Sequence, residues 1–596
     1  MDPLKEYQTR LNRWRQEAEY LEMRHRWTGN LRLVFAVALM AIGAALIRWV
    51  PVPFLLTGIF VGIFLSGTIH DRVIEKLGMA RQLVGFYERG LDRLSDRWMG
   101  KGSGGAEFLT PQHPYAIDLD ILGPGSLFEF VNTTQTGAGR AKLAEWLLGS
   151  VGQEEIAARR ASIQELRDRF DLREGIARRT VDHTRHINTN GLLAWAARPL
   201  KLTALPIRIL GAVLVPLTYG LLLAGEYELF LAPFSVLCVF ALAYRRRTAV
   251  AFASMNLRSG ELKWLAELLA LFENENFQAP RLRELQSKWR RENLSAAANL
   301  RRLATLADWM DSSDNDIFKL VGGPLLLKTQ FGFALASWHA RHHARIPDWL
   351  LALGEMEALC SLAGYAGEHP EDVFPDLIFD SASPSIAAQG LAHPLVAESR
   401  GVRNDLVLDS SQPLHVISGS NMSGKSTWLR AIGTNLVLAL AGAPVRARAF
   451  RMTPLQIGAS IRTVDSLQEG ISRFYAEIKR LRQLVQMADR PERLIFLIDE
   501  VLAGTNSHDR QIGAAFIVKA LVDRKAVGLI TTHDLALTQV VDQVTPPGAN
   551  FHFEDQMVGG KLSFDYQLQP GVVKKSNALD LMRSIGLDVQ PVPCTT

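Results

Sequence analysis

One nine-residue stretch, GSNMSGKST at Gly419–Thr427, has the residue types and the spacing needed to hold a chain of phosphate groups. It follows the apolar run PLHVIS, which predicts a buried strand, and it precedes WLRAIGTNLVLAL, which predicts a helix. Gly419 and Gly424 let the backbone turn so that its N–H groups point inward at the phosphates. Lys425 is expected to reach the β- and γ-phosphates, and the hydroxyl of Ser426 is expected to bind Mg²⁺. The stretch therefore predicts a site for ATP and Mg²⁺.

Two further apolar runs end in polar side chains of the kind that hydrolyse a nucleotide. The run Leu494–Ile498 predicts a buried strand that ends in Asp499 and Glu500. One acid at the end of such a strand can hold Mg²⁺, and a second can orient or polarise the attacking water. The run VGLITTHDLAL predicts another buried strand, at whose end Thr532 and His533 are placed to sense the γ-phosphate. Together these residues predict an ATPase.

An α/β domain must position these residues, because strand, glycine-rich turn and helix follow one another in the last third of the chain. The expected fold class is an α/β P-loop NTPase domain at the C-terminus, preceded by a mostly α-helical region with two transmembrane hairpins. The expected catalytic residues are Lys425, Glu500 and His533, and the expected metal ligands are Ser426 and Asp499.

The transmembrane hairpins are predicted from four apolar runs that lie upstream in two pairs. Leu33–Ile47 and Val52–Ile69 are joined by RWVP, and Ile207–Ala224 and Leu229–Tyr244 are joined by GEYE. Each run is just long enough to cross about 30 Å of hydrocarbon. The alternative is a buried helical hairpin in a large soluble domain, since the runs are short and contain glycine and proline.

The distribution of charge favours spanning helices and gives them an orientation. The short connecting loops hold only Arg48, Glu226 and Glu228. Because basic residues gather on the cytoplasmic side of a membrane, we expect both hairpins to point outward. Both termini and the ATPase domain are then cytoplasmic, and the protein is a multi-pass protein of the cytoplasmic membrane. The flanking basic residues are Arg24, Arg26, Arg32, Arg72, Lys76, Arg81, Lys201, Arg208 and Arg245–Arg247.

The overall composition sets weaker limits. Lysine and arginine exceed aspartate and glutamate by 66 − 61 = 5 over 596 residues, a mild excess that is compatible with nucleic acid or anionic lipid and diagnostic of neither. The three cysteines are far apart and match no metal or disulfide spacing. The arginines of the helical region 250–365 are expected to lie on a solvated helix face rather than to form a dedicated nucleic-acid patch.

The phosphate-binding stretch resembles that of one family, the MutS mismatch-repair ATPases. The family's stretch has the form G-P-N-M-G-G-K-S-T, and Asn421 and Met422 match its distinctive part. The family's second motif ends D-E-x-x-x-G-T, which Gly504 and Thr505 complete in this chain. Between the two motifs the family carries a signature of Ser, Phe and Glu. The matching residues are Ser472, Phe474 and Glu477.

The resemblance runs from about Asp118 to Gly586 and is strongest after His393. It implies a homodimer in which the signature serine of one subunit, here Ser472, completes the nucleotide site of the other subunit. It also implies DNA as a partner. The nucleotide-binding residues that follow from the motifs and the resemblance are Gly419, Ser420, Asn421, Met422, Ser423, Gly424, Lys425, Ser426, Thr427 and Ser472.

The chain also departs from the family's pattern. We expect the chain to lack the family's mismatch-reading domain with its Phe-x-Glu wedge, and we interpret Phe86 and Glu88 in GFYERG as a coincidental match. Leu502 replaces a glycine that is usual in the second motif. The apolar hairpins are typical of a membrane-attached branch of the family. DNA binding is therefore expected to be weak and not specific for a mismatch.

Three functions of different classes stay open. The first is a membrane-anchored MutS-like ATPase that acts on DNA or another polymer. The second is an ATP-driven transporter, although the chain has no LSGGQ-type signature and almost no polar residues in its apolar runs. The third is a membrane scaffold in which the nucleotide only switches the conformation. The expected segments are an N-terminal helix (1–30), hairpin one (31–70), a helix and flexible linker (71–117), a helical core (118–204), hairpin two (205–245), a second part of the helical core (246–370) and the ATPase domain (371–590).

Overall fold

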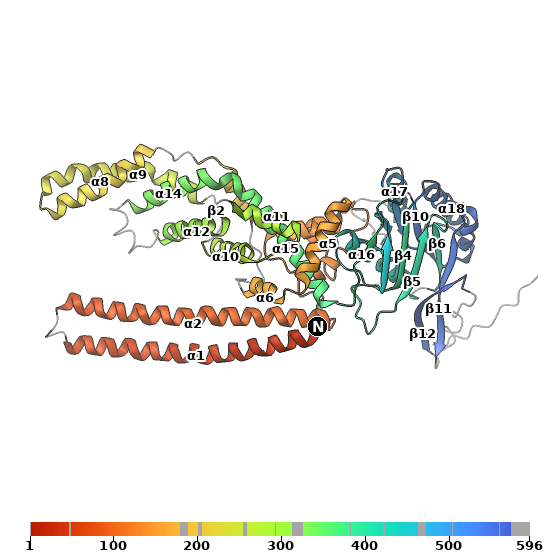
Figure 1. Ribbon diagram of the computed structural model, residues 1–596, viewed down its shortest axis with the longest axis horizontal. Coiled ribbons are helices and arrows are strands. Elements are labelled where there is room, and N and C mark those ends of the chain that lie inside the picture. The colour runs from red at the N-terminus through yellow and green to blue at the C-terminus, as the bar shows by residue number, and fades with distance from the viewer. Residues whose placement is uncertain are drawn as a thin grey trace, which may run out of the picture. The chain divides into compact units, whose positions relative to one another are not determined.

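A computed structural model describes most of the chain, which divides into two compact units (Figure 1). The helical unit is Met1–Leu91, Thr134–Arg140 and Arg169–Ala358. The sheet unit is Asp92–Thr133, Ala141–Asp168 and Leu359–Thr596. The residues that the structure describes are 2–46, 49, 51–178, 189–200, 205–253, 259–291, 294–312, 326–381, 383–420, 423–462, 473–502, 505–558 and 561–573.

The helical unit begins with two long helices that lie side by side and antiparallel, α1 (Pro3–Leu46) and α2 (Val52–Leu94) (Figure 1). Glycine allows their close approach, since a Cβ added to Gly90 would lie 2.3 Å from the ring of Tyr7. The same ring packs edge-on against Tyr87, with the centroids 5.6 Å apart. These contacts join the two helices into a hairpin.

A second antiparallel pair consists of α8 (Leu205–Leu223) and α9 (Tyr227–Ala253). A third helix, α14 (Leu327–His342), packs on α9. At this contact the ring of Phe333 lies 5.3 Å from the ring of Tyr244, measured between centroids. Helix α14 therefore packs along one side of the second helical pair.

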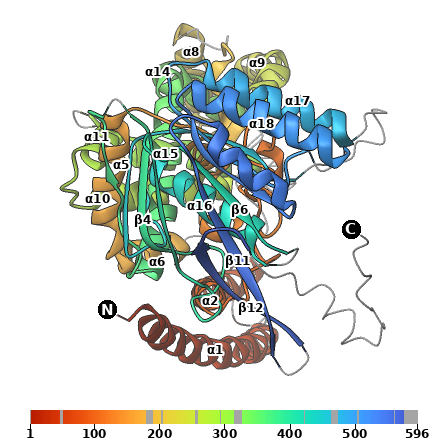
Figure 2. The same ribbon diagram turned by 90° about the vertical axis from the view of Figure 1, so that its right-hand side faces the viewer.

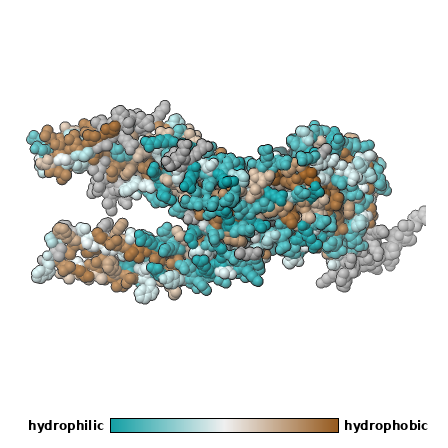
Figure 3. Space-filling model, in the orientation of Figure 1, coloured by the Kyte–Doolittle hydropathy of each residue, from teal (hydrophilic) through white to brown (hydrophobic). Residues whose placement is uncertain are grey.

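Both helical pairs expose apolar side chains towards their free ends (Figure 3). Within the described residues, two segments are long and apolar enough to cross a membrane, Pro3–Leu46 and Tyr227–Tyr244. Only 6% of the apolar window of each is buried, unlike the core helix of a soluble protein. Val213–Leu223 is apolar but shorter. Two helices could thus cross a membrane by length and composition, and the arrangement of four spans stays a prediction.

The rest of the helical unit is a set of packed helices. They are α6 (Phe170–Arg178), α7 (Thr189–Ala197), α10 (Ser259–Asn274), α11 (Pro280–Trp289), α12 (Ala296–Ser312), η2 (His343–Arg345) and α15 (Ile346–Glu368), which continues into the sheet unit from Leu359, with the short strands β1 (Arg290–Arg291) and β2 (Leu294–Ser295). Helix α10 packs on α12. The buried indole of Trp289 donates a hydrogen bond to the carbonyl oxygen of Trp349 at 3.1 Å, which ties α11 to α15.

The sheet unit contains a six-stranded sheet with the strand order β12-β11-β6-β10-β9-β8. Its strands are β6 (Leu414–Ser418), β8 (Gln456–Ser460), β9 (Leu494–Ile498), β10 (Val527–Thr532), β11 (Ala549–Val558) and β12 (Lys561–Pro570). From β11 to β8 the pairing is parallel, and β12 runs antiparallel to β11. The three apolar runs of the sequence form β6, β9 and β10, because a continuous apolar run suits a strand that is covered on both faces.

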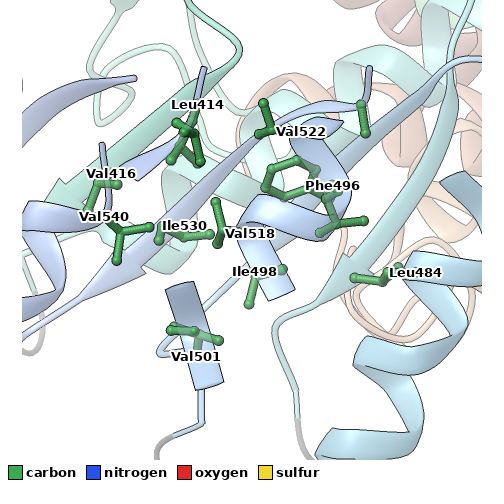
Figure 4. Close-up of a cluster of buried hydrophobic side chains, with 14 of the residues drawn as sticks. Leu414, Val416, Leu484, Phe496, Ile498, Val501, Val518, Val522, Ile530 and Val540 are labelled. Carbon is green, nitrogen blue, oxygen red and sulfur yellow. The ribbon is translucent and has the colours of Figure 1, made fainter. Parts of the chain in front are cut away.

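Helices cover both faces of this sheet. They are α16 (Lys425–Leu440), α17 (Arg473–Ala488), α18 (Ser507–Asp523) and the 3₁₀ segment η3 (Leu535–Gln543). The last three bury their apolar side chains against one face, where Phe496 and Ile498 point (Figure 4), and α17 lies beside α18 (Figure 2). Helix α16 covers the other face, where a Cβ on Gly433 would lie 3.0 Å from the side chain of Leu497.

A smaller, mostly antiparallel sheet completes the unit and was not predicted from the sequence. Its strand order is β3-β7-β4-β5, and β4 pairs antiparallel with both β5 and β7. The strands are β3 (Asp376–Leu377), β4 (Ser385–Leu391), β5 (Asn404–Asp409) and β7 (Ala449–Met452). The remaining elements of the unit are η1 (Ala106–Phe108), α3 (Leu127–Val131), α4 (Gly137–Leu148), which begins in the helical unit, and α5 (Gln153–Arg167).

In the glycine-rich stretch Gly100–Gly105, expected to be a flexible linker, the residues from Gly102 onward pack against neighbouring segments instead. The N–H of Gly102 donates to Oε1 of Glu129 at 3.0 Å, and a Cβ on Gly104 would lie 2.2 Å from the carbonyl oxygen of Gly123. The linker prediction is wrong because glycine serves close backbone approach as well as flexibility, and composition does not separate the two.

Candidate nucleotide-binding site

The phosphate-binding stretch lies between the end of β6 and the start of α16, which confirms the predicted order of strand, turn and helix. Gly424 caps α16 with a φ of 100°, in the left-handed region. A Cβ at Gly424 would lie 2.9 Å from the ring of Tyr566, so a side chain here would strain the backbone and collide with that ring. The helix therefore starts with its free N–H groups at the turn, the arrangement that binds phosphate.

Lys425 holds the turn closed. Its side chain is 4% exposed, and its Nζ donates to the carbonyl oxygens of Gly419 and Ser420, both at 2.8 Å. Burial lowers the pKa of Lys425, and the negative charges of Glu500 and Asp499 act in the opposite direction. A phosphate group at the turn would compensate this buried cation, as predicted for the residue.

Ser426 and Asp499 meet where α16 and β9 approach each other. The Ser426 hydroxyl donates to Oδ2 of Asp499 at 2.5 Å, and Thr531 donates to Oδ1 of the same carboxylate. Mg²⁺ prefers such oxygen ligands and completes its octahedron with phosphate oxygens and water. In the described part of the chain, no group of three or more His, Cys, Asp or Glu residues could hold a metal by itself. The two predicted ligands therefore fit a Mg²⁺ ion that binds together with a nucleotide.

Two hydroxyl groups of the turn fit a phosphate chain for another reason. The side-chain oxygens of Ser420 and Ser423 are buried and have no hydrogen-bond partner within the described residues. Such a group costs free energy unless something satisfies it. The oxygens of a triphosphate would accept hydrogen bonds from both hydroxyls, so these two side chains fit the predicted ligand.

Glu500 follows Asp499 and occupies an unusual backbone position. Its φ is 46°, and its N–H donates to Oγ1 of Thr531 at 3.1 Å. The exposed His533 lies against it, with Nδ1 at 3.3 Å from Oε1 of Glu500. Thr532 turns elsewhere, since its hydroxyl contacts the carbonyl oxygen of Asp534 at 3.2 Å. Thr531, which the sequence interpretation passed over, is thus the threonine that serves the site.

A cavity of about 660 Å³ opens beside the turn. The start of α16 and Glu500 form one part of its wall. Aromatic rings and polar side chains line the rest of the cavity, and such groups suit the base and the sugar of a nucleotide. The cavity-lining residues that the sequence analysis did not assign to the site include His393, Arg400, Asn404, Trp428, Phe553 and Tyr566.

Asn404 explains how these distant segments form one wall. It is 7% exposed, its Nδ2 donates to the carbonyl oxygen of Tyr566 at 3.0 Å, and its Oδ1 accepts from the N–H of Leu568 at 2.8 Å. The side chain thereby pairs with β12 as another strand would. This pairing fixes Tyr566 at the cavity, with a φ of 54°.

Four residues that the sequence assigns to the site or its motifs lie outside the described residues, and their roles stay predictions. They are Asn421, Met422, Ser472 and Gly504. Thr427 lines the cavity. The structure brings together the other predicted residues around the turn and the ends of β9 and β10: Gly419, Ser420, Ser423, Gly424, Lys425, Ser426, Asp499, Glu500 and His533.

The strand that leads into the turn should make the fold sensitive to acid. His415 of β6 is 2% exposed and packs on the ring of Phe551, and burial lowers its pKa to about 4. Its ordinary pKa is about 6.5, so the unfolded chain takes up a proton that the folded chain refuses. The contribution of the neutral His415 to the free energy of unfolding is fully present above pH 6.5 and is lost as the pH falls towards 4. At pH 5 the difference between the folded and unfolded pKa of His415 should lower the free energy of unfolding by about 2 kcal/mol.

His415→Leu should remove that loss. We expect its melting temperature to exceed that of the wild type by about 4–8 °C at pH 5 and to differ much less at pH 7. The exposed His508, replaced by leucine, is the matched control and should show no such difference between the two pH values. Equal melting temperatures of His415→Leu and wild type at pH 5 would contradict the prediction.

Comparison with known proteins agrees with this geometry. Residues 415–592 match the family described as MutS domain V. The DNA mismatch repair protein MutS of Natronomonas pharaonis is 31% identical over 256 residues, which cover 41% of this chain and 28% of that protein. The Endonuclease MutS2 of Thermus thermophilus is 30% identical over 203 residues, 33% of this chain and 25% of that protein. The chain thus spans about a quarter of the length of these relatives. Residues 415–592 of this chain therefore form a domain of the MutS domain V type.

Proposed function

We propose that this protein is a membrane-anchored ATPase that binds ATP with Mg²⁺, hydrolyses it in a dimer and acts on DNA. The observation that carries the ATPase proposal is the contact between Ser426 and Asp499, which joins the phosphate-binding turn to the acidic end of β9. It lies beside a cavity of about 660 Å³, large enough for a nucleotide. The proposal that it acts on DNA rests on similarity to a DNA mismatch repair protein and to an endonuclease.

Each side chain of the site has its own task in this proposal. Lys425 and the N–H groups of the turn bind the phosphates, and Ser426 with Asp499 would hold Mg²⁺, which offsets the charge of the phosphoryl group when bound. Glu500 lines the cavity and can orient a water molecule and accept its proton. His533 contacts that carboxylate from the exposed side and can hold its orientation.

The proposed dimer follows from the resemblance and from the charge of the ligand. Lys425 and a Mg²⁺ ion held by Ser426 and Asp499 would offset only part of the negative charge of the triphosphate. A hydroxyl or a helix N-terminus from a second subunit can supply further stabilisation. Ser472, just before α17, is the residue that we assign to this task in the partner's site.

The membrane proposal extends the two apolar segments to four spans in two hairpins. A protease-cleavable tag inserted in the GEYE loop should be cut in intact spheroplasts, because we place that loop outside. The same tag inserted after the exposed Gln153 should be cut only after lysis. We also expect the protein to stay with the membrane fraction until detergent is added. Recovery of the full chain in detergent-free supernatant would overturn the four-span arrangement.

The DNA proposal predicts a particular kind of binding. We expect the contacts to rest on arginine and lysine at the phosphates, so affinity should fall steeply between 50 and 200 mM salt. We expect equal affinity for matched and mismatched duplexes. A tenfold preference for a mismatch, about 1.4 kcal/mol, would overturn this prediction.

One experiment separates the ATPase from its rivals. The protein is purified in detergent, and phosphate release is measured with no DNA and with duplex, branched and single-stranded DNA. Turnover that DNA stimulates supports the proposal. ATP binding without turnover would favour the nucleotide-switched scaffold, and turnover that responds to a transported solute but not to DNA would favour a transporter.

A further inference from the structure

Glu477 makes a contact that none of the assigned roles explains. It lies on α17 and is 5% exposed, although carboxylates are rarely buried without a task. Its Oε1 accepts a hydrogen bond from the N–H of Leu502 at 2.5 Å. Leu502 is two residues beyond Glu500, so Glu477 contacts the loop that carries the proposed general base.

That loop has a backbone conformation that its residues do not favour. Glu500 has a φ of 46° and Leu502 a φ of 53°, both in the left-handed region where residues other than glycine are strained. Such a conformation persists only if its surroundings hold it. The leucine at 502, where the family usually has glycine, makes the need for an external hold larger in this chain.

Among the described residues, side chains from three neighbouring elements form hydrogen bonds with the backbone of Glu500 and Leu502. Thr531 accepts the N–H of Glu500 at 3.1 Å, Glu477 accepts the N–H of Leu502, and Nε of Arg510 donates to the carbonyl oxygen of Leu502 at 3.1 Å. The side chain of Leu502 is itself buried at 5% exposure. Among these three contacts, the one that Glu477 makes is the one that comes from α17, the helix that begins directly after Ser472.

We propose that Glu477 is a positioning residue for Glu500. Its hydrogen bond with the N–H of Leu502 holds the left-handed turn that directs the Glu500 carboxylate into the nucleotide cavity. This inference rests on the proposed ATPase function and deepens it. Without this hydrogen bond, the left-handed turn relaxes and the Glu500 carboxylate moves out of the cavity. The phosphate-binding turn, which Lys425 holds, is unchanged. Movement of α17 is then transmitted to the base by one hydrogen bond.

The test compares two substitutions of the full-length protein in detergent. Glu477→Ala removes the acceptor and should lower kcat for ATP by on the order of 10–100-fold, the effect of misplacing a catalytic group by about 1 Å. The Kd for ATP should change less than about threefold, within the range of an indirect effect. Glu477→Gln keeps an acceptor oxygen at the same place and should restore kcat to within about threefold of wild type.

Arg480→Ala is the matched control on the same helix. Arg480 lies three residues beyond Glu477 and donates to the carbonyl oxygen of Ala459 and the carboxylate of Asp118, neither of them in Leu502's loop, so its loss loosens the helix without releasing that loop. It should lower the melting temperature at least as much as Glu477→Ala and reduce kcat far less. Equal losses of kcat in the two variants at equal melting temperature would show that Glu477 only stabilises the fold.

The outcomes for the inference and for the ATPase are distinguishable. A wild type that hydrolyses ATP together with an unchanged kcat in Glu477→Ala overturns the inference alone. A parallel loss of ATP affinity and kcat, which Glu477→Gln does not restore, also overturns it. A wild type without any turnover overturns the proposed function and the inference with it.

Discussion

Replacing Glu500 by glutamine should lower kcat for ATP hydrolysis by about 10²–10⁴-fold, the usual contribution of a general base, and should leave ATP binding intact. Glutamine has nearly the same size and can keep a contact with His533, 3.3 Å from the present carboxylate, but it cannot take a proton from water. The contact between Ser426 and Asp499 is untouched. Phosphate release in steady state and the Kd for ATP, measured on the same preparation, separate the two effects.

Lys425→Ala should behave in the opposite way and abolish measurable ATP binding. The lysine provides the buried cation of the site and also the two hydrogen bonds to the carbonyl oxygens of Gly419 and Ser420, so the turn loses its charge and its shape together. Glu492→Gln, an exposed acid two residues before β9, is the control and should change neither kcat nor Kd. Turnover of Glu500→Gln close to that of the wild type would assign the base to another group.

The core of the site could be predicted because its residues are close in sequence to the elements that hold them. Apolar runs ending in Ser418, Ile498 and Thr532 form three adjacent parallel strands, and the carboxyl ends of parallel strands meet at one edge of a sheet. The turn and the two acids are therefore adjacent once the strands are assigned. The order of the strands in the sheet was not needed for that conclusion.

The rest of the site depends on contacts that a sequence pattern does not carry. Asn404 and Tyr566 meet across 162 residues, and Glu477 meets Leu502 across 25. Neither pair has a periodicity or a spacing that marks it. The left-handed φ of Leu502 is equally hidden, because leucine rarely adopts it and only the surrounding hydrogen bonds impose it. The motifs indicated the phosphate-binding turn, the two acids and Glu477 as a signature residue, but they did not indicate the contacts that Asn404 and Glu477 make.

Mixing Lys425→Ala subunits with Ser472→Ala subunits should restore activity that neither variant has alone. If Ser472 of one subunit completes the site of the other, a mixed dimer has one site with both lesions and one site with neither. Random mixing in equal amounts makes half of the dimers mixed, and each has one intact site of two, so turnover should return to about a quarter of the wild-type value. Ser472 lies outside the described residues, and the prediction rests on the resemblance and on the charge of the site.

The measurement needs subunits with different tags, so that mixed dimers can be purified after exchange in detergent and assayed alone. Purified mixed dimers should then reach about half of the wild-type turnover, because one of their two equivalent sites is complete. Ser472→Ala should leave the hydrogen bonds of Lys425 and the contact between Ser426 and Asp499 in its own subunit unchanged, and so should still bind ATP. Full activity of Ser472→Ala alone, or mixed dimers without turnover, would place the complete catalytic site within one subunit.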